Sequence, residues 1–302
     1  MSTESGTSPA PWRMLATARS DTPYFVFTHG MLDPWFKRQY PLKHVKKWLF
    51  WPWSTYWLLR NATGVFFTTE QERILARESF WLYKCREMVV GYGTSVPPGN
   101  DRQQIACFRS AFGKQLGARN LLYVGRIHPK KGCDLLIEGF AHVMGADPKW
   151  RLVIAGPDPT GWRSQLEALA QRLGIADRIV WTGQIEGNLK WGAFKVADAF
   201  VLPSHQENFS VVVAEALACS LPALISDKVN IWREIETTGA GLVAPDTLEG
   251  VISLLARWEA RPPDAVATMR AAALRCFNAQ FEIGAASQRI INVLTNPAER
   301  TG

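Results

Sequence analysis

Two glutamates in the second half of the chain have a spacing and a setting that suit ligand binding. Seven residues separate Glu207 from Glu215 within the stretch Ser204–Pro222. Glu215 lies in VVVAEALAC, which is apolar on nearly every side and predicts a buried helix. A carboxylate there is costly unless a polar group meets it. Carboxylates accept hydroxyl protons, which suits a polyol ligand. The structural alternatives are a position beside a helix N-cap for Glu207 and a buried pair with Lys or Arg for Glu215.

A second candidate motif, GRIHPKKG, spans Gly125–Gly132. It follows an apolar strand-like run and precedes a helical pattern. Gly125 allows a tight turn, Arg126 and Lys131 supply cations, and a helix beginning near Gly132 turns its free N–H groups toward the same place. Arginine meets phosphate oxygens through its planar fork, and lysine acts as a point charge. Together these groups match a diphosphate; the alternative is an ordinary solvated loop.

The elements around these motifs predict a parallel α/β sheet. From Asn120 onward, short apolar runs alternate with helical patterns: the runs are LLYVG, RLVIAG, RIVWTG, DAFVLP and PALIS. This alternation is typical of a doubly wound sheet. Ligands bind such sheets at the carboxyl ends of the strands, where both candidate motifs fall.

The motifs resemble those of the retaining nucleotide-sugar glycosyltransferases of family four, which have the GT-B fold. The Glu-x7-Glu spacing, GRIHPKKG, LPALISD and GAGLVAP occur in the family's order. The resemblance covers residues 119–296 well and residues 24–115 more loosely. It implies two Rossmann-like, doubly wound parallel-sheet domains. The first would be incomplete, because only three strands are recognisable there, at Tyr24–Thr28, Gly64–Thr68 and Glu87–Gly91.

The resemblance also implies roles for individual residues. Glu207 would hydrogen-bond hydroxyls of the donor sugar, and Glu215 would hold the ribose hydroxyls. Asn208, Phe209 and Ser210 would form a turn whose backbone N–H groups hold phosphate. Many relatives have a glycine where Ser210 stands, so close backbone approach is less assured here.

In the first domain, the loop THGMLDPW resembles the family's histidine-glycine loop facing the donor. His29 would donate to a sugar hydroxyl or meet the acceptor, unless it is simply a satisfied loop histidine. Asp33 is a weaker candidate for acceptor binding. No Asp-x-Asp occurs, and His128 and His205 lack metal-ligand spacing, so we expect no metal and no cofactor. Instead, the two cations of GRIHPKKG would neutralise the leaving diphosphate, which takes the acceptor's proton in the resembled family.

Composition and charge narrow the remaining choices. The net charge of +7 arises entirely within residues 1–118, which favours an anionic partner for that part. Five scattered cysteines without a Cys-x-x-Cys favour a reducing compartment. No run of 18 apolar residues occurs, and the first residues do not form a signal peptide. We therefore expect a cytoplasmic protein, with a peripheral position at the inner face of the membrane as an alternative.

The segment Lys43–Arg60 is basic and rich in tryptophan, and no acidic residue occurs between Asp33 and Glu70. Pro52 should interrupt any helix there. Three interpretations follow: aromatic core beside an acceptor cleft, an anionic membrane surface, and, least supported, single-stranded nucleic acid. We do not expect nucleic acid as a partner.

These observations predict four regions: a disordered tail (1–20), a partial acceptor-side domain (21–117), a nucleotide-sugar domain (118–276) and a helix crossing back to the first domain (277–302). The expected function is transfer of a sugar, with retention of configuration, from a nucleoside-diphosphate sugar to a glycan or a lipid-linked saccharide. The alternatives are a nucleotide-sugar-binding regulatory subunit and a nucleotide-sugar epimerase. An incomplete first domain would leave a sheet edge uncovered and favour self-association.

Overall fold

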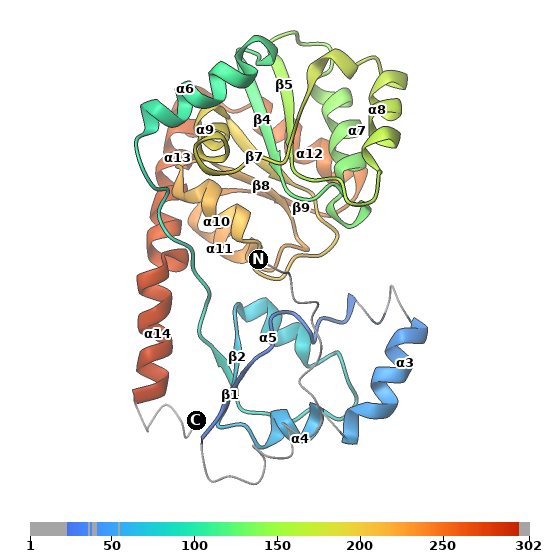
Figure 1. The fold of residues 1–302 in the computed structure, drawn as a ribbon, viewed down its shortest axis with the longest axis vertical. Helices are drawn as coiled ribbons and strands as arrows, with labels where there is room; N and C mark the ends of the chain where they lie inside the picture. The colour runs from blue at the N-terminus through green and yellow to red at the C-terminus, as the bar shows by residue number, and fades with distance from the viewer. Residues whose placement is uncertain (1–22, 36, 38–40, 54, 296–302) are drawn as a thin grey trace. The chain divides into compact units, whose positions relative to one another are not determined.

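The computed structural model describes residues 23–35, 37, 41–53 and 55–295. The expected tail at 1–20 lies outside these residues. The chain divides into two compact units, one reaching to Gly91 and resuming at Gln288, the other running from Tyr92 to Ser287. Each unit is a parallel α/β arrangement, which confirms the predicted fold class (Figure 1).

The second unit is built on a six-stranded, all-parallel sheet in the order β6-β5-β4-β7-β8-β9. The five apolar runs found in the sequence are its first five strands, and GLVA adds the sixth at the edge. Most strand residues are buried, as expected when helices cover both faces. The strands are β4 (Arg119–Val124), β5 (Trp150–Ala155), β6 (Ile179–Gly183), β7 (Ala199–Leu202), β8 (Ala223–Ser226) and β9 (Gly241–Ala244).

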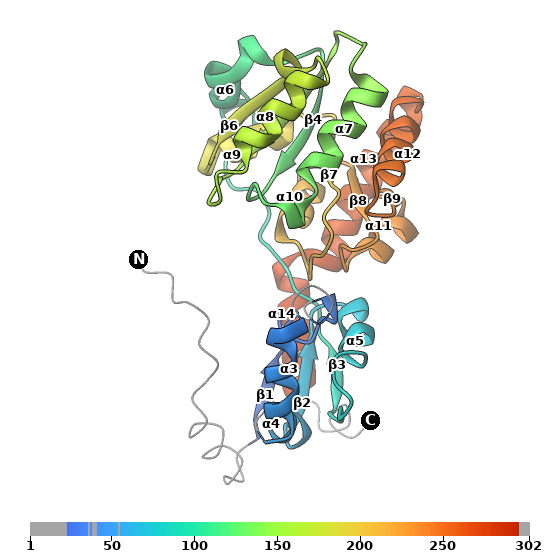
Figure 2. The same cartoon turned by 90° about the vertical axis from the view of Figure 1, so that its right-hand side faces the viewer.

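The helices of this unit also pack on one another. α12 packs on α7 and α7 on α8, whereas α9 packs on α6 and α13 packs on α10 and α11. Figure 2 shows α7, α8 and α12 alongside the strands that they connect or cover. Their bounds are α6 (Asp101–Phe112), α7 (Cys133–Met144), α8 (Arg163–Arg172), α9 (Gly187–Val196), α10 (Val211–Ala218), α11 (Trp232–Thr238), α12 (Leu248–Glu259) and α13 (Pro263–Cys276), with 3-10 turns η2 (Gly113–Gln115), η3 (Pro129–Lys131) and η4 (Ala176–Arg178).

The boundary between the units differs from the predicted one. It falls after Gly91 rather than near residue 117, because α6 belongs to the second unit. Asn100 caps α6 by accepting from Arg102 N, and Phe108 is fully buried where the helix packs on α9. The polar and proline-rich composition of residues 92–100 marks only the approach to this helix.

The carboxyl-terminal segment also differs in detail from a single helix. A π-helical turn, η5 (Phe277–Phe281), follows α13, and the extended residue Glu282 separates it from α14 (Ile283–Thr295). Phe281 O accepts from Thr94 N, which holds this turn within the second unit. Residues from Gln288 to the end of α14 belong to the first unit, where Arg289 Nε donates to Val90 O at 3.1 Å.

The first unit has a three-stranded parallel sheet in the order β1-β2-β3 among its described residues. The three predicted strands are present, each one or two residues shorter than expected. Around them lie α3 (Pro41–Phe50), η1 (Trp51–Trp53), α4 (Thr55–Arg60) and α5 (Glu70–Ala76), and the strands are β1 (Phe25–Phe27), β2 (Gly64–Phe67) and β3 (Glu87–Val89).

The tryptophan-rich segment is only partly core. As Pro52 predicts, the helix is interrupted, and the 3-10 turn η1 separates α3 from α4. Trp51, Tyr56 and Leu59 are buried, whereas the larger share of the apolar side chains here faces outward. The exposed ones are Leu42, Val45, Trp48, Leu49, Phe50, Trp53 and Trp57.

Candidate active site

The strand order locates the candidate site within the second unit. From β4 the sheet is extended through β5 and β6 in one direction, and from β7 through β8 and β9 in the other. The order therefore reverses between β4 and β7, and ligands of doubly wound sheets bind outside the strand ends at such a switch point. GRIHPKKG follows β4, and SHQENFS follows β7 (Figure 1). Thus the topology brings both sequence motifs to the position where a ligand is expected.

Close backbone packing shapes the loop after β4. Gly125 N donates to Ala155 O at 2.9 Å, and the buried Tyr123 hydroxyl donates to Arg126 O at 2.8 Å. Gly156 lies so near that an added Cβ would approach Gly125 O to 1.9 Å. The backbone of the motif is thereby fixed from two sides, while the side chain of Arg126 is exposed.

The last glycine of the motif joins the two loops. Gly132 is the N-cap of α7 with φ +66°, and a Cβ there would come within 2.3 Å of Pro203 O. Next to this contact, Lys130 O accepts from His205 N at 2.8 Å and from Ser204 Oγ at 3.0 Å. The glycine that the sequence indicates for phosphate approach therefore also allows the second motif to pack against the first.

Lys131 and Glu207, one from each motif, form an ion pair. Both side chains are mostly buried, and Ser204 Oγ lies 3.2 Å from the same carboxylate oxygen, Oε1. The backbone of Glu207 is bonded on both sides, since its N–H donates to Lys228 O and its carbonyl accepts from Asn230 N, each at 3.0 Å. The arrangement places a cation and a carboxylate side by side on a fixed backbone.

Asn208, Phe209 and Ser210 lead from this pair into α10. Phe209 is buried and makes edge contacts with Tyr92 and Phe281. Ser210 has φ +58° and ψ +77°, a left-handed conformation that a residue with a Cβ adopts at a cost. The serine therefore holds a backbone conformation that glycine adopts more readily.

Glu215 is buried in α10 and pairs with Lys190 of α9, Nζ to Oε1 at 2.6 Å. This is the pairing that the structural alternative required, and it leaves a role toward a ligand open as a proposal. Lys190 also lies over the ring of Trp191. Sequence reasoning missed Lys190 because it stands in a helix with no motif of its own, and only the sheet order brings α9 beside α10.

Neighbouring titratable groups stay neutral because they are buried. Burial raises the pKa of the Cys133 thiol to about 11 and that of Cys219 to about 12. Burial likewise raises the pKa of Tyr123 well above its usual value. These thiols and this hydroxyl therefore add no charge to the site at neutral pH.

The two histidines beside the motifs have structural contacts. His128 caps η3, accepting from Lys130 N through Nδ1 at 3.1 Å. His205 Nδ1 lies 2.8 Å from a carboxylate oxygen of Asp246. Within the described part of the chain, no group of three or more His, Cys, Asp or Glu side chains could hold a metal ion.

His29, the candidate in the first unit, follows β1. It has φ +45°, is exposed, and stacks on Phe27 with ring centroids 5.2 Å apart. The buried Asp33 accepts from Trp35 N, which closes the same loop. The strained and exposed histidine is consistent with a functional position, and its role remains a prediction.

Glu72, which the sequence does not single out, holds the His29 loop. Its Oε1 accepts from Thr28 Oγ1 at 2.7 Å and Gly30 N at 2.6 Å, while Oε2 accepts from Thr68 N at 2.7 Å and Thr68 Oγ1 at 2.6 Å. Four donors satisfy a buried carboxylate that would otherwise be costly. The residues on either side of His29 are thus tied to α5.

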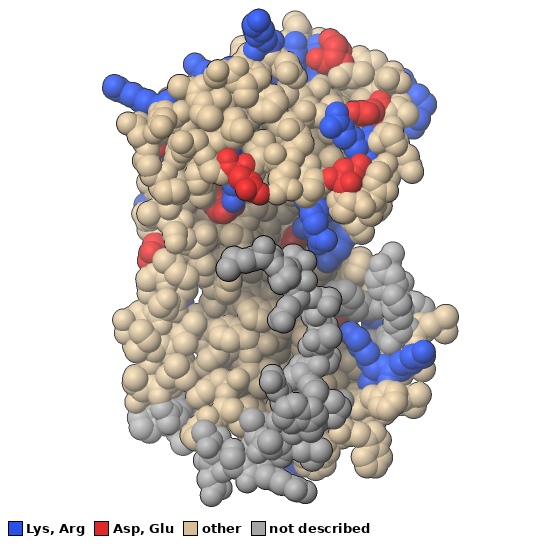
Figure 3. Space-filling model, viewed as in Figure 1, with Lys and Arg blue, Asp and Glu red and all other residues tan. Residues whose placement is uncertain are grey.

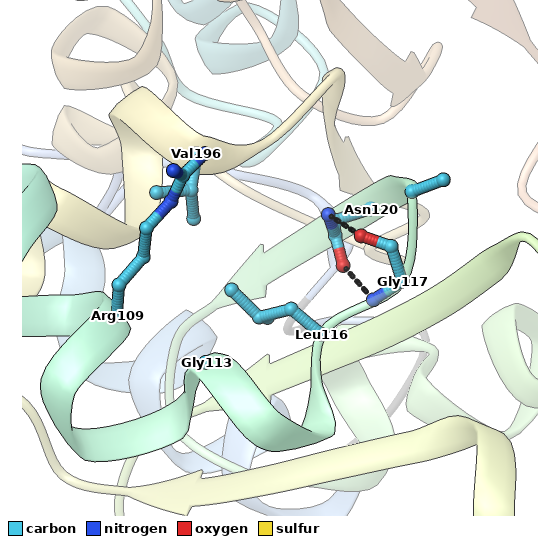
Figure 4. Close-up of a pocket in the computed structure, with 7 residues that line it drawn as sticks. Arg109, Gly113, Leu116, Gly117, Asn120 and Val196 are labelled. Carbon is cyan, nitrogen blue, oxygen red and sulfur yellow. Dashed lines mark hydrogen bonds between the residues drawn. The ribbon is translucent and has the colours of Figure 1, made fainter.

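A hollow of about 310 Å³ elsewhere in the second unit is a poor site candidate. It lies at the amino end of β4, opposite the end where ligands bind such sheets. Figure 4 shows the Asn120 side chain bonded to both backbone groups of Gly117, so its polar atoms serve the loop.

Comparison with solved structures identifies the fold as GT-B-like. Sucrose-phosphate synthase from Thermosynechococcus elongatus superposes with a TM-score of 0.74 at 22% identity, covering 94% of this chain and 69% of that one. Anabaena HepE in complex with UDP superposes with a TM-score of 0.76 at 17% identity, covering 94% of this chain and 75% of that one. WaaG, a glycosyltransferase involved in lipopolysaccharide biosynthesis, superposes with a TM-score of 0.67 at 18% identity, covering 94% of this chain and 80% of that one.

Sequence comparison gives the family. The model described as "Glycosyl transferases group 1" matches residues 106–273, more than half of the chain, and a "Glycosyl transferase 4-like domain" matches residues 3–93. The chain therefore belongs to the group 1 glycosyl transferases. A D-inositol 3-phosphate glycosyltransferase from Geodermatophilus obscurus is 30% identical over 77% of this chain and 58% of its own length. A D-inositol 3-phosphate glycosyltransferase from Segniliparus rotundus is 33% identical over 52% of this chain and 34% of its own length. The chain thus spans less than two thirds of the length of these curated relatives.

Proposed function

We propose that this chain transfers a sugar from a nucleoside-diphosphate sugar to an acceptor, with retention of configuration. The observation that carries the proposal is the Lys131–Glu207 pair at the switch point of the sheet. A ligand meeting both groups needs an anionic part next to a hydroxyl-bearing part. A sugar bonded to a diphosphate has this combination.

The other candidate residues extend this assignment. Arg126 and Lys131 hold the diphosphate, assisted by backbone N–H groups at the start of α7. Glu207 and Glu215 accept protons from the sugar and ribose hydroxyls, respectively. The backbone of Asn208, Phe209 and Ser210 contributes donors at the start of α10. Support comes from Anabaena HepE, a structural neighbour solved with UDP and with UDP-glucose.

In the proposed reaction, the bond from the anomeric carbon to the leaving phosphate oxygen breaks as the acceptor oxygen bonds the same face. The acceptor proton passes to the departing phosphate, so no enzyme nucleophile is needed. The two cations stabilise the charge that develops on the diphosphate, a role often given to a metal ion. His29 contributes a hydrogen bond to the donor sugar or the acceptor. The acceptor is a glycan or a lipid-linked saccharide.

A thermal-shift screen of UDP-, GDP- and ADP-sugars tests the donor assignment, since a ligand that binds only the folded state raises the melting temperature. One nucleotide class should stabilise the wild type, and Glu215→Leu should reduce the shift for the free nucleoside diphosphate as well as for the sugar. Glu207→Gln should reduce turnover with little loss of fold. If no nucleotide sugar stabilises the protein, the assignment fails.

Product analysis then separates the alternatives. NMR of the product should show the donor's anomeric configuration retained when an acceptor is supplied. Turnover of donor without acceptor to a different sugar would instead favour an epimerase. Donor binding with no turnover on any acceptor would favour a binding or regulatory subunit.

A further inference from the structure

An exposed apolar stripe runs along α3 of the first unit. Leu42, Val45 and Leu49 follow an i, i+3, i+7 spacing and therefore share one side of the helix. All three are exposed, Leu42 to 84%. Phe50, the last residue of α3, and Trp53 in the following turn η1 are also exposed, Trp53 again to 84%. We call these five residues the α3 surface.

Basic side chains border the α3 surface, and acidic ones are absent from the sequence around it. Lys46 and Lys47 are exposed on the neighbouring arc of the helix. No aspartate or glutamate occurs between Asp33 and Glu70. Figure 3, viewed as Figure 1, shows blue side chains projecting from the tan surface in the region of α3. An apolar stripe beside lysines is the composition of helices that lie in the interface of an anionic bilayer.

The segment is anchored to the unit by other residues. Trp51 stacks on Phe80 with ring centroids 3.7 Å apart, and its Nε1 donates to Leu82 O. Tyr56 and Leu59 are buried in the same core. These buried side chains belong to η1 and α4, which follow α3, so α3 is attached to the unit through its carboxyl end while its own described side chains are exposed.

We propose that the α3 surface docks on an anionic lipid bilayer. Aliphatic and aromatic side chains enter the acyl boundary, and the lysines meet lipid phosphates. A second copy of the chain is a poorer occupant, because a symmetric contact would bring the same lysines together. Single-stranded nucleic acid is also poorer, because three of the five residues, Leu42, Val45 and Leu49, are aliphatic and offer it no stacking. This inference does not depend on the donor assigned above.

Flotation with lipid vesicles tests the proposal on the full chain. The wild type should float with vesicles of phosphatidylcholine and phosphatidylglycerol, whereas much less protein should float with vesicles of pure phosphatidylcholine. Replacing Lys46 and Lys47 by Gln should weaken binding roughly fivefold per lysine. The triple change Leu42→Ser, Leu49→Ser and Trp53→Ser should weaken it more, because apolar burial is lost. High salt should release the protein only in part.

The matched control alters an exposed basic and an exposed apolar residue of the second unit, Arg172→Gln with Leu173→Ser. It should bind vesicles like the wild type. Circular dichroism and melting temperature should show every variant folded. Absence of wild-type flotation on anionic vesicles would overturn the proposal, as would unchanged flotation of the folded α3 variants. Light scattering adds one more outcome. If the wild type is a dimer and the α3 variants are monomers, the α3 surface contacts a second copy of the chain, and the lipid assignment is overturned.

Discussion

At the scale of single residues, each candidate glutamate of the second unit is held by a lysine. Lys131 meets Glu207 on the loops, and Lys190 meets Glu215 inside the helix layer. These pairs explain how carboxylates are tolerated in mostly buried positions. They also mean that a change at either partner alters both stability and the charge available to a ligand, so the two effects must be measured separately.

The Glu215–Lys190 pair gives a prediction on stability. Lys190→Met should lower the free energy of unfolding by about 1–3 kcal/mol, because it leaves a buried carboxylate without its partner. Glu215→Leu combined with Lys190→Met should cost less than the two single changes added together, since the double variant buries no unpaired charge. Urea denaturation of the four proteins measures this. Strictly additive losses would show that the pair is not coupled.

Ser210 gives a prediction on backbone strain. A left-handed conformation costs a residue with a Cβ ~1–2 kcal/mol, and a glycine removes this cost. Glycine also gives the unfolded chain more conformational freedom, which stabilises the unfolded state by ~0.4–1 kcal/mol and offsets part of the gain. Ser210→Gly should therefore raise the free energy of unfolding by about 0.5–1 kcal/mol. Ser164→Gly, within α8, is the control and should lower it. A destabilised Ser210→Gly protein would show that the serine side chain makes a compensating contact.

At the scale of elements, the contact between the loops after β4 and β7 is the feature that assembles the site. Gly132→Ala should destabilise the protein by about 2 kcal/mol or more, because the new Cβ meets Pro203 O as well as a positive φ. Gly174→Ala is a matched control, since Gly174 has φ +70° with open space around it, and it should cost only ~1–2 kcal/mol. If denaturant unfolding shows that Gly132→Ala and Gly174→Ala lower the free energy of unfolding equally, the contact between the two loops adds nothing to stability.

Elements of the second unit could be predicted from the sequence because the strands are short apolar runs between amphipathic helices. The same pattern placed GRIHPKKG and the loop that carries Glu207 at the carboxyl ends of strands. What could not be predicted depends on long-range packing. Lys190 meets Glu215 only because β6 and β7 are far apart in the sheet and α9 returns between them. Likewise, α6 was assigned to the first domain, because its largely polar sequence does not show that Phe108 packs where the helix meets α9.

In the first unit, sequence reasoning found the three strands but not the groups that organise them. Glu72 was unremarkable in a charged helix, and its four donors come from loops up to 44 positions away. The tryptophan-rich segment Lys43–Arg60 could not be assigned to core or surface, because periodicity alone does not show which side of an amphipathic helix is covered. The structure shows Trp51 packed and Trp53 exposed two positions later.

At the scale of the whole molecule, the residues proposed to bind the donor lie in the second unit, except His29, whose loop belongs to the first. Among the described residues, no helix is long and apolar enough to cross a membrane. The chain spans less than two thirds of the length of these curated relatives.

Metal chelation gives a prediction at this scale. Since two cations stand where the diphosphate is proposed to bind, donor affinity and transfer should be unchanged by EDTA. The measurement compares turnover before and after chelation, and again with added Mn²⁺ or Mg²⁺. Loss of transfer on chelation, with recovery on addition of manganese, would contradict the proposed charge stabilisation by Arg126 and Lys131.

Calorimetric titration of the nucleoside diphosphates into the wild type, Arg126→Ala and Lys131→Ala tests the central claim most directly. The wild type should bind one of UDP, GDP and ADP. Each variant should bind it more weakly by ~1.5–3 kcal/mol, the worth of a hydrogen bond to a charged group. Arg172→Gln, which removes an exposed cation of α8, should bind like the wild type. Folded Arg126→Ala and Lys131→Ala proteins with unchanged affinity would contradict the placement of the diphosphate at GRIHPKKG.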